Sequence, residues 1–95
     1  MVIKFVKVLP LVKRDYTDRN GQAATFRTKP FIVANDSGQL YVEAIQEHAD
    51  VLEALDIHEG DCAFVQMSTV AREYKTQSGD VRYANEATLT KCVML

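Results

Sequence analysis

Short runs of β-branched and aromatic residues, separated by Gly, Asn and Asp, fill most of the chain. This texture is typical of β-strands joined by tight turns, and no other feature constrains the fold as strongly. It predicts five strands, over residues 3–16, 25–35, 39–45, 62–74 and 81–93. Pro10 and Pro30 fall inside the first two strands. Each needs a strand edge or a bulge, because proline lacks the N–H that a sheet requires.

One segment has the spacing of a helix instead of a strand. Ile45, Ala49, Leu52 and Leu55 recur at intervals of four, three and three, which predicts an amphipathic helix over residues 46–55. Acidic side chains occupy the opposite side of this segment. The helix would therefore bury one stripe and present negative charge to solvent.

The predicted order is three strands, one helix and two strands, in a chain of 95 residues that suits a single domain. This order is that of an all-β OB-fold, a five-stranded Greek-key barrel with one short helix between its third and fourth strands. The same elements can also form an open α+β sandwich. We expect the closed barrel because the first strand is long enough to pair on both sides.

Alternation along the strands predicts which side chains are buried. On the last strand, Val81, Tyr83, Ala87, Leu89 and Val93 fall on one face. The phenylalanines expected in the core are Phe5, Phe26, Phe31 and Phe64. The last strand should therefore be half-buried along its whole length.

Charge is segregated along the chain, although the net charge is only −2. Residues 1–29 hold seven basic and two acidic side chains, residues 30–71 hold eight acidic and no basic ones, and residues 72–95 hold four basic and three acidic ones. In an OB barrel, the acidic block falls on the helix at one end, and basic residues fall near the two loops that frame the ligand face. These basic residues are Lys13, Arg14, Arg19, Arg27, Lys29, Arg72, Lys75 and Arg82. The sequence does not decide whether Arg27 and Lys29 share a face with Phe31, because Pro30 interrupts the alternation of that strand. A polyanion would therefore meet a positive face.

Tyr16, Tyr41 and Tyr74 add aromatic surface close to these basic residues. Tyr41 points out of the barrel if its neighbours Leu40 and Val42 point in. Unpaired bases stack on such rings, and each stack contributes about 1–3 kcal/mol. Tyrosines also end strands simply because they are amphipathic. Rings and cations together favour a site for single-stranded nucleic acid, with DNA preferred and RNA kept as an alternative.

The chain is most distinctive around its last hairpin. The distinctive stretch comprises Glu59-Gly60-Asp61, an apolar strand ending in Arg72-Glu73-Tyr74-Lys75, the turn Thr76-Gln77-Ser78-Gly79-Asp80, and Val81-Arg82-Tyr83. Over residues 59–94 it resembles the bacterial single-stranded DNA-binding protein family. The resemblance implies a role in DNA replication, recombination or repair. It also implies a base-stacking Tyr74, backbone contacts from Arg72, Lys75 and Arg82, and a structural Tyr83.

The rest of the chain matches that family only in architecture. Leu9-Pro10-Leu11-Val12 replaces a glycine-containing first turn, there is no tryptophan, and no acidic tail follows Leu95. These departures imply a bare barrel with fewer stacking platforms and weaker affinity, similar to the primosomal replication protein B type. The resemblance also implies a homodimer or homotetramer formed through the first strand, which would shield sheet edges.

Catalysis, cofactors and metals are not expected. His48 and His58 are the only histidines that can serve a nucleophile, and both fall in the acidic helical region. The glycines are scattered and no paired Cys or His motif occurs, so neither a phosphate loop nor a zinc site is predicted. The alternative function is a protein-interaction OB module that uses its acidic helix face.

The sequence shows neither a signal peptide nor an apolar run long enough to span a membrane. We therefore expect a cytoplasmic protein. Cys62 and Cys92 fit that compartment as reduced thiols. If the two residues lie opposite one another on paired strands, a cross-strand disulfide is geometrically conceivable.

Overall fold

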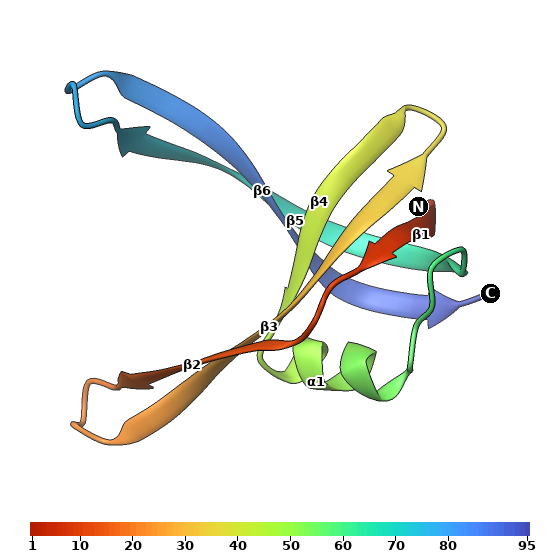
Figure 1. Cartoon of the computed structure of the whole chain (residues 1–95), viewed down its shortest axis with the longest axis horizontal. Helices are drawn as coiled ribbons and strands as arrows, with labels where there is room; N and C mark the ends of the chain where they lie inside the picture. The colour runs from red at the N-terminus through yellow and green to blue at the C-terminus, as the bar shows by residue number, and fades with distance from the viewer.

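The computed structural model describes residues 1–95 as one sheet and one helix. The strands are β1 (Val2–Val8), β2 (Val12–Thr17), β3 (Ala23–Asn35), β4 (Gly38–Ile45), β5 (Cys62–Lys75) and β6 (Val81–Met94), and the helix α1 (Glu47–Ala54) follows β4 (Figure 1). The predicted first strand is divided into β1 and β2. Pro10 lies in the break between them, because its ring restricts φ and it has no N–H to pair.

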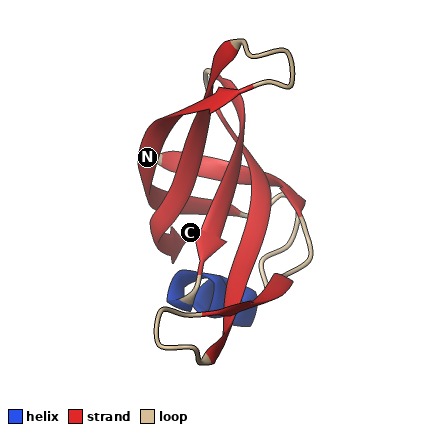
Figure 2. Ribbon diagram, turned by 90° about the vertical axis from the view of Figure 1, so that its left-hand side faces the viewer, coloured by secondary structure: helices blue, strands red, loops and turns tan.

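The sheet closes on itself. Its strand order is β1-β5-β6-β4-β3-β2, and β1 pairs with β3 as well as with β5. Figure 2 shows the strands wrapped around one another, with the helix at one end. Every pairing is antiparallel except that of β4 with β6, where Glu43 lies beside Thr88. Taken as one long strand, β1 and β2 complete a five-stranded ring. The predicted OB-fold is therefore confirmed, and the first strand does pair on both sides.

Pro30 sits in the middle of β3 without breaking the sheet. The pairing of β1 ends at Phe31 and that of β2 begins at Thr28, so Pro30 lies opposite the gap between the two strands. Its carbonyl accepts a hydrogen bond from the Leu9 N–H at 3.2 Å. In an antiparallel ladder, the N–H and C=O of one residue face the same neighbour, so the missing N–H of Pro30 also faces this gap.

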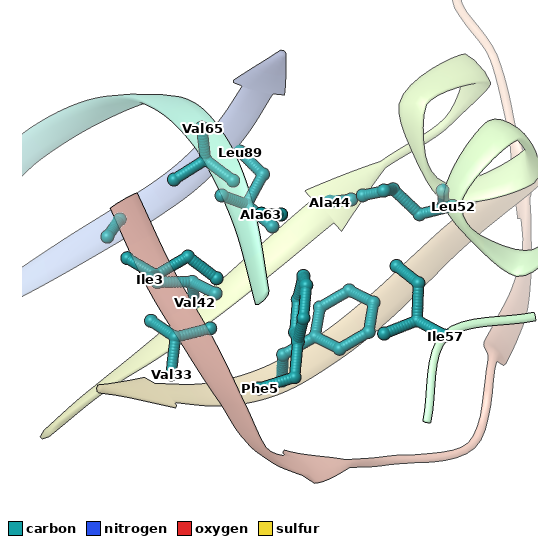
Figure 3. Close-up of a cluster of buried hydrophobic side chains, with 13 residues drawn as sticks. Ile3, Phe5, Val33, Val42, Ala44, Leu52, Ile57, Ala63, Val65 and Leu89 are labelled. Atoms are coloured by element: carbon teal, nitrogen blue, oxygen red, sulfur yellow. The ribbon is translucent and has the colours of Figure 1, made fainter. Parts of the chain in front are cut away.

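The core fills the ring between the two ends of the barrel. Phe5 and Phe31 are fully buried, and their ring centroids lie 5.0 Å apart in a tilted arrangement. Figure 3 shows Phe5 among the buried side chains of this cluster. Small and branched side chains from the strands pack around these rings: Ile3, Val33, Val42, Ala44, Ala63, Val65, Ala87 and Leu89. A core of this kind is what holds a small barrel together, because apolar burial is its main favourable free energy.

Helix α1 closes one end of the barrel and packs against β3, β4 and β6. Ala49 and Leu52 are buried as predicted, but Leu55 is exposed. The helix ends at Ala54, and the buried Ile57 closes the barrel in place of Leu55. The chain contains no helix with the length and apolar character needed to cross a membrane.

Two of the four phenylalanines expected in the core are not there. Phe64 is 45% exposed, because its neighbours Ala63 and Val65 point inward and strand alternation turns it outward. Phe26 is only partly buried, and it lies five residues from Phe31, an odd spacing that places the two rings on opposite faces of β3. The core predictions for Phe64 and Phe26 are therefore wrong.

A β-bulge in β6 alters the predicted pattern of the last strand. Gln66 pairs with Lys91 and Met67 pairs with Leu89, which leaves Thr90 as the extra residue. Ala87 and Leu89 point inward, but beyond the bulge the alternation reverses, so that Val93 is 50% exposed. Val81 and Tyr83 are exposed because that half of the β5–β6 hairpin extends beyond the barrel (Figure 1).

The two cysteines do not face one another. Cys92 pairs with Val65, whereas Cys62 lies opposite Lys4 of β1 and accepts a backbone hydrogen bond from Leu95. Both thiols are free. The cross-strand disulfide considered from the sequence is therefore not formed, because the register offsets the two residues.

Candidate nucleic-acid interface

Two hairpins extend past the barrel on the same side of the molecule. In Figure 1, the β5–β6 hairpin forms the upper arm and the β2–β3 hairpin forms the lower arm. Each tip is held by side chains: the Asp18 carboxylate accepts hydrogen bonds from the backbone of Asn20 and Gln22, both at 2.9 Å, and the Thr76 hydroxyl accepts one from Asp80 at 3.2 Å. The arms therefore frame a defined stretch of sheet.

The outer face of that sheet follows from strand alternation. Because Phe31 and Val42 point into the barrel, their neighbours along β3 and β4 point outward. The register places Arg14 beside Phe26, Tyr41 beside Ile32 and Glu43 beside Pro30. These three pairs form a band that crosses the outer surface from β2 to β4.

Two hollows on this band join into one groove. The first, of about 260 Å³, is lined by Val12, Arg14, Phe26, Thr28, Pro30, Tyr41 and Glu43. The second, of about 350 Å³, is lined by Leu40, Tyr41, Glu43, Asn85, Glu86, Ala87 and Thr88. Tyr41 and Glu43 belong to both. We call the combined surface the outer groove; it runs across the sheet from β2 to β6.

Aromatic rings lie along the outer groove with polar groups at their edges. The Arg14 guanidinium carbon lies 6.0 Å from the centroid of the Phe26 ring, within the range of a cation–π contact. Tyr41 is 52% exposed, and its hydroxyl donates a hydrogen bond to Glu43 Oε1 at 2.9 Å. Burial, this hydrogen bond and the charge of Glu43 all raise the pKa of Tyr41. The neutral phenol is therefore favoured, and its hydroxyl is directed toward Glu43.

The β5–β6 arm carries the residues singled out by the family resemblance. Tyr74 pairs with Arg82 across the hairpin, and Arg72 lies on the same face as both. All three are exposed and far from the buried core. Arg72 Nε donates to Glu86 Oε1 at 2.8 Å, which places this guanidinium beside the second hollow of the outer groove. Lys75 lies on the other face of the arm, opposite Val81.

The β2–β3 arm divides its predicted residues between two faces. Tyr16 and Arg14 are two residues apart on β2, so their side chains project from the same face of the strand. Arg14 lines the outer groove, and this face therefore continues into it. Lys13 lies on the opposite face, beside Arg27. Arg19 is at the tip of the arm, next to the turn. The structure therefore brings Arg14 and Tyr16 together at the groove and places Lys13 away from it.

Two of the predicted basic residues face the helix instead. Arg27 Nε lies 2.8 Å from Asp50 Oδ1, and Lys29 Nζ lies 2.7 Å from Glu53 Oε2. Lys29 is only 7% exposed. Both residues have the same strand parity as Phe31, and α1 covers that end of the barrel. The prediction that they lie on the ligand face is therefore wrong, and they neutralise acidic residues of the helix.

Phe26 and Glu43 were not predicted as site residues. The sequence signal for Phe26 is its odd spacing from Phe31. On a regular strand, this spacing places only one of the two rings in the core, unless a bulge lies between them. The signal for Glu43 was its alternation with Val42 and Ala44, the same pattern that places Tyr41 outside. In the sequence, Glu43 falls within the acidic block of residues 30–71, which is predicted to lie at the helix end of the barrel.

Closed strand order, one parallel β4–β6 contact and a helix between β4 and β5 define an OB-fold protein. No protein-family model matches the chain, and no curated protein sequence matches it significantly. Among solved structures, it is similar to the second OB-fold domain of replication protein A from Methanococcus maripaludis. The TM-score is 0.59 at 18% identity, with 99% of this chain and 79% of that chain covered. At this identity the likeness shows the fold.

Proposed function

We propose that this chain is a non-enzymatic protein that binds single-stranded DNA in the outer groove, in replication, recombination or repair. The observation that carries the proposal is the groove itself, which holds the exposed Tyr41 ring at its centre and Phe26 beside it. Arg14 lies at one end, and Arg72 lies at the other. OB-folds bind oligonucleotides on this face, framed by these two loops.

Each part of the site has a role in this proposal. Unpaired bases stack on Tyr41 and Phe26, while phosphates meet guanidinium groups at the two ends of the groove. On the arms, stacking by Tyr16 and Tyr74 and charge from Arg19 and Arg82 extend the contact. Lys13 and Lys75 lie on the faces turned away from it and are not part of this contact. Single-stranded RNA offers the same bases and phosphates and is the alternative ligand. The fold of the replication protein A domain and the resemblance to bacterial single-stranded DNA-binding proteins support the same class. The cytoplasmic location stays a prediction.

Fluorescence anisotropy with a labelled oligo-dT and a duplex of equal length tests the proposal. The single strand is expected to bind more tightly, and its affinity should fall steeply with salt because bound phosphates release counterions. Tyr41→Ala should weaken binding by about 1–3 kcal/mol. Tyr83→Ala is the matched control, since Tyr83 is an exposed tyrosine on the opposite face of the β5–β6 arm. Absence of binding at low salt contradicts the proposal.

We also propose that the chain forms a homodimer or homotetramer. Val2, Phe64 and Val93 are exposed and lie side by side in a row across the outer faces of β1, β5 and β6. This row shares no residue with the outer groove, so self-association through it leaves the groove free. Light scattering coupled to size-exclusion chromatography should give an oligomer for the wild type and a folded monomer for Phe64→Asp. A monomeric wild type contradicts this part.

A second candidate function is protein docking on α1. Val51 and Leu55 are exposed there, among acidic residues that Arg27 and Lys29 neutralise only in part. A protein partner held by this surface should bind the Tyr41→Ala variant as tightly as the wild type. A single strand bound in the outer groove should bind that variant more weakly.

A further inference from the structure

Glu43 places a carboxylate in the middle of the outer groove. The residue points outward from β4, opposite Pro30 of β3 and beside Thr88 of β6. It lines both hollows and is partly buried between them. A negative group is unexpected at the centre of a surface that is proposed to bind a polyanion.

This carboxylate has no cationic partner. No Lys, Arg or His nitrogen lies within 4.0 Å of Glu43, whereas the other acid in the groove, Glu86, is paired with Arg72 at 2.8 Å. The donor that Glu43 does have is the Tyr41 hydroxyl, at 2.9 Å. An ionised carboxylate offers about four acceptor positions. Acceptor positions of Glu43 therefore remain free beside the edge of the Tyr41 ring.

The distribution of charge orients a bound strand. Arg14 attracts phosphate to one end of the groove, and the terminal guanidinium nitrogens of Arg72, which Glu86 does not bind, attract it to the other. The unpaired charge of Glu43 repels phosphate from the centre. A base stacked on Tyr41 would then present its hydrogen-bonding edge to Glu43. We propose that Glu43 reads the Watson–Crick edge of that base and favours guanine over thymine. This inference rests on the proposed function, since it concerns the same groove.

The preference follows from the donors that each base offers. Guanine presents a ring N–H and an exocyclic amino group side by side, which match the two oxygens of a carboxylate. Adenine and cytosine present one amino group beside a ring-nitrogen acceptor. Thymine presents one N–H between two carbonyl oxygens, which a carboxylate repels. A bidentate pair discriminates against the wrong base, and at this half-open site we expect a preference of about fivefold, which corresponds to about 1 kcal/mol.

The test compares labelled oligo-dT with the same oligomer carrying a few guanines, spaced widely so that they cannot form quadruplexes. Anisotropy titrations use the full-length protein, its Glu43→Gln variant and Glu73→Gln as a control. Glu73 also accepts a hydrogen bond from a tyrosine, Tyr83, at 3.1 Å, but it lies on the β5–β6 arm outside the groove. Inosine in place of guanine removes the amino group and keeps the ring N–H.

Wild type and Glu73→Gln are expected to bind the guanine-containing strand about fivefold more tightly than oligo-dT. Glu43→Gln should lose most of this preference and bind oligo-dT more tightly than wild type does, because the central repulsion is gone. Inosine should fall between guanine and thymine. Equal binding of both strands by wild type, or a preference that persists in Glu43→Gln, overturns the inference while single-strand binding stands. Absence of binding to every strand overturns the proposed function itself.

Discussion

The ion pair between the buried Lys29 and the half-exposed Glu53 yields an asymmetric prediction. The Lys29 side chain is 9% exposed, and its ammonium lies 2.7 Å from the carboxylate of Glu53 and 5.8 Å from the Phe31 ring centroid. The Glu53 side chain is 48% exposed. Removing Glu53 therefore leaves a buried charge without its partner, whereas removing the charge of Lys29 leaves a carboxylate that water can solvate.

The exposure of each partner sets the expected magnitude. Loss of one partner from a buried pair costs about 3–5 kcal/mol, and an exposed pair contributes about 0.2–1 kcal/mol. Because solvent screens Glu53, Glu53→Ala should lower the free energy of unfolding by about 1–3 kcal/mol. Lys29→Met keeps the apolar stem against Phe31 and should stay within about 1 kcal/mol of wild type. In the double variant, the loss caused by Glu53→Ala should largely disappear.

Urea unfolding followed by far-ultraviolet circular dichroism measures these differences, since the chain has no tryptophan to report by fluorescence. A double-mutant cycle then isolates the coupling between Lys29 and Glu53. Alanine is a good helix former, so Glu53→Ala does not weaken α1 through its propensity. Equal losses for the two single variants, or strictly additive losses in the double variant, would refute the reasoning.

Three further predictions concern the core and two titrating groups. Phe31→Ala should lower the free energy of unfolding by about 3–5 kcal/mol, measured by urea unfolding, because the ring is fully buried. The raised pKa of Tyr41 favours the neutral phenol in the folded state. The neutral phenol therefore contributes fully to folding stability at pH values below the pKa of Tyr41 in the unfolded chain. This contribution is lost as the pH rises through the pKa of Tyr41 in the folded protein. Tyrosinate absorbance, taken as the difference from Tyr41→Phe, should show this residue titrating at lower pH in Glu43→Gln. Burial raises the pKa of Cys92, so iodoacetamide should modify the exposed Cys62 first, as mass spectrometry of timed samples will show.

The sequence anticipated the elements of the fold well, because their signals are local. Turn residues at Asp36-Ser37-Gly38 and Glu59-Gly60-Asp61 separate runs whose alternation or helical spacing is complete within a few residues. The predicted helix over residues 46–55 differs from α1 by one residue at each end. The order of elements then restricted the topology to very few folds.

The predicted orientation of side chains is wrong where closure of the barrel, and not local sequence, sets the alternation along a strand. The bulges at Val6 and Thr90 come from fitting curved strands against their neighbours, and each reverses the alternation beyond it. Val93 is turned outward for this reason. The register of the β5–β6 hairpin, set where Lys75 pairs with Val81, already offsets Cys62 from Cys92, and the bulge at Thr90 adds one residue to that offset. A run of residues carries no local signal for such a shift, since it depends on strands that are distant in the chain.

By itself, the sequence determined the strand-rich texture, the single helix, the segregation of charge and an exposed tyrosine in the middle of a strand. Tertiary structure decided which charges are free. It turned Arg27 and Lys29 onto the helix and left Arg14 at the groove. It also placed Glu43 unpaired beside Tyr41. The physical reason is that periodicity is a property of neighbouring residues, whereas ion pairing depends on which side chains closure of the sheet brings within a few ångströms.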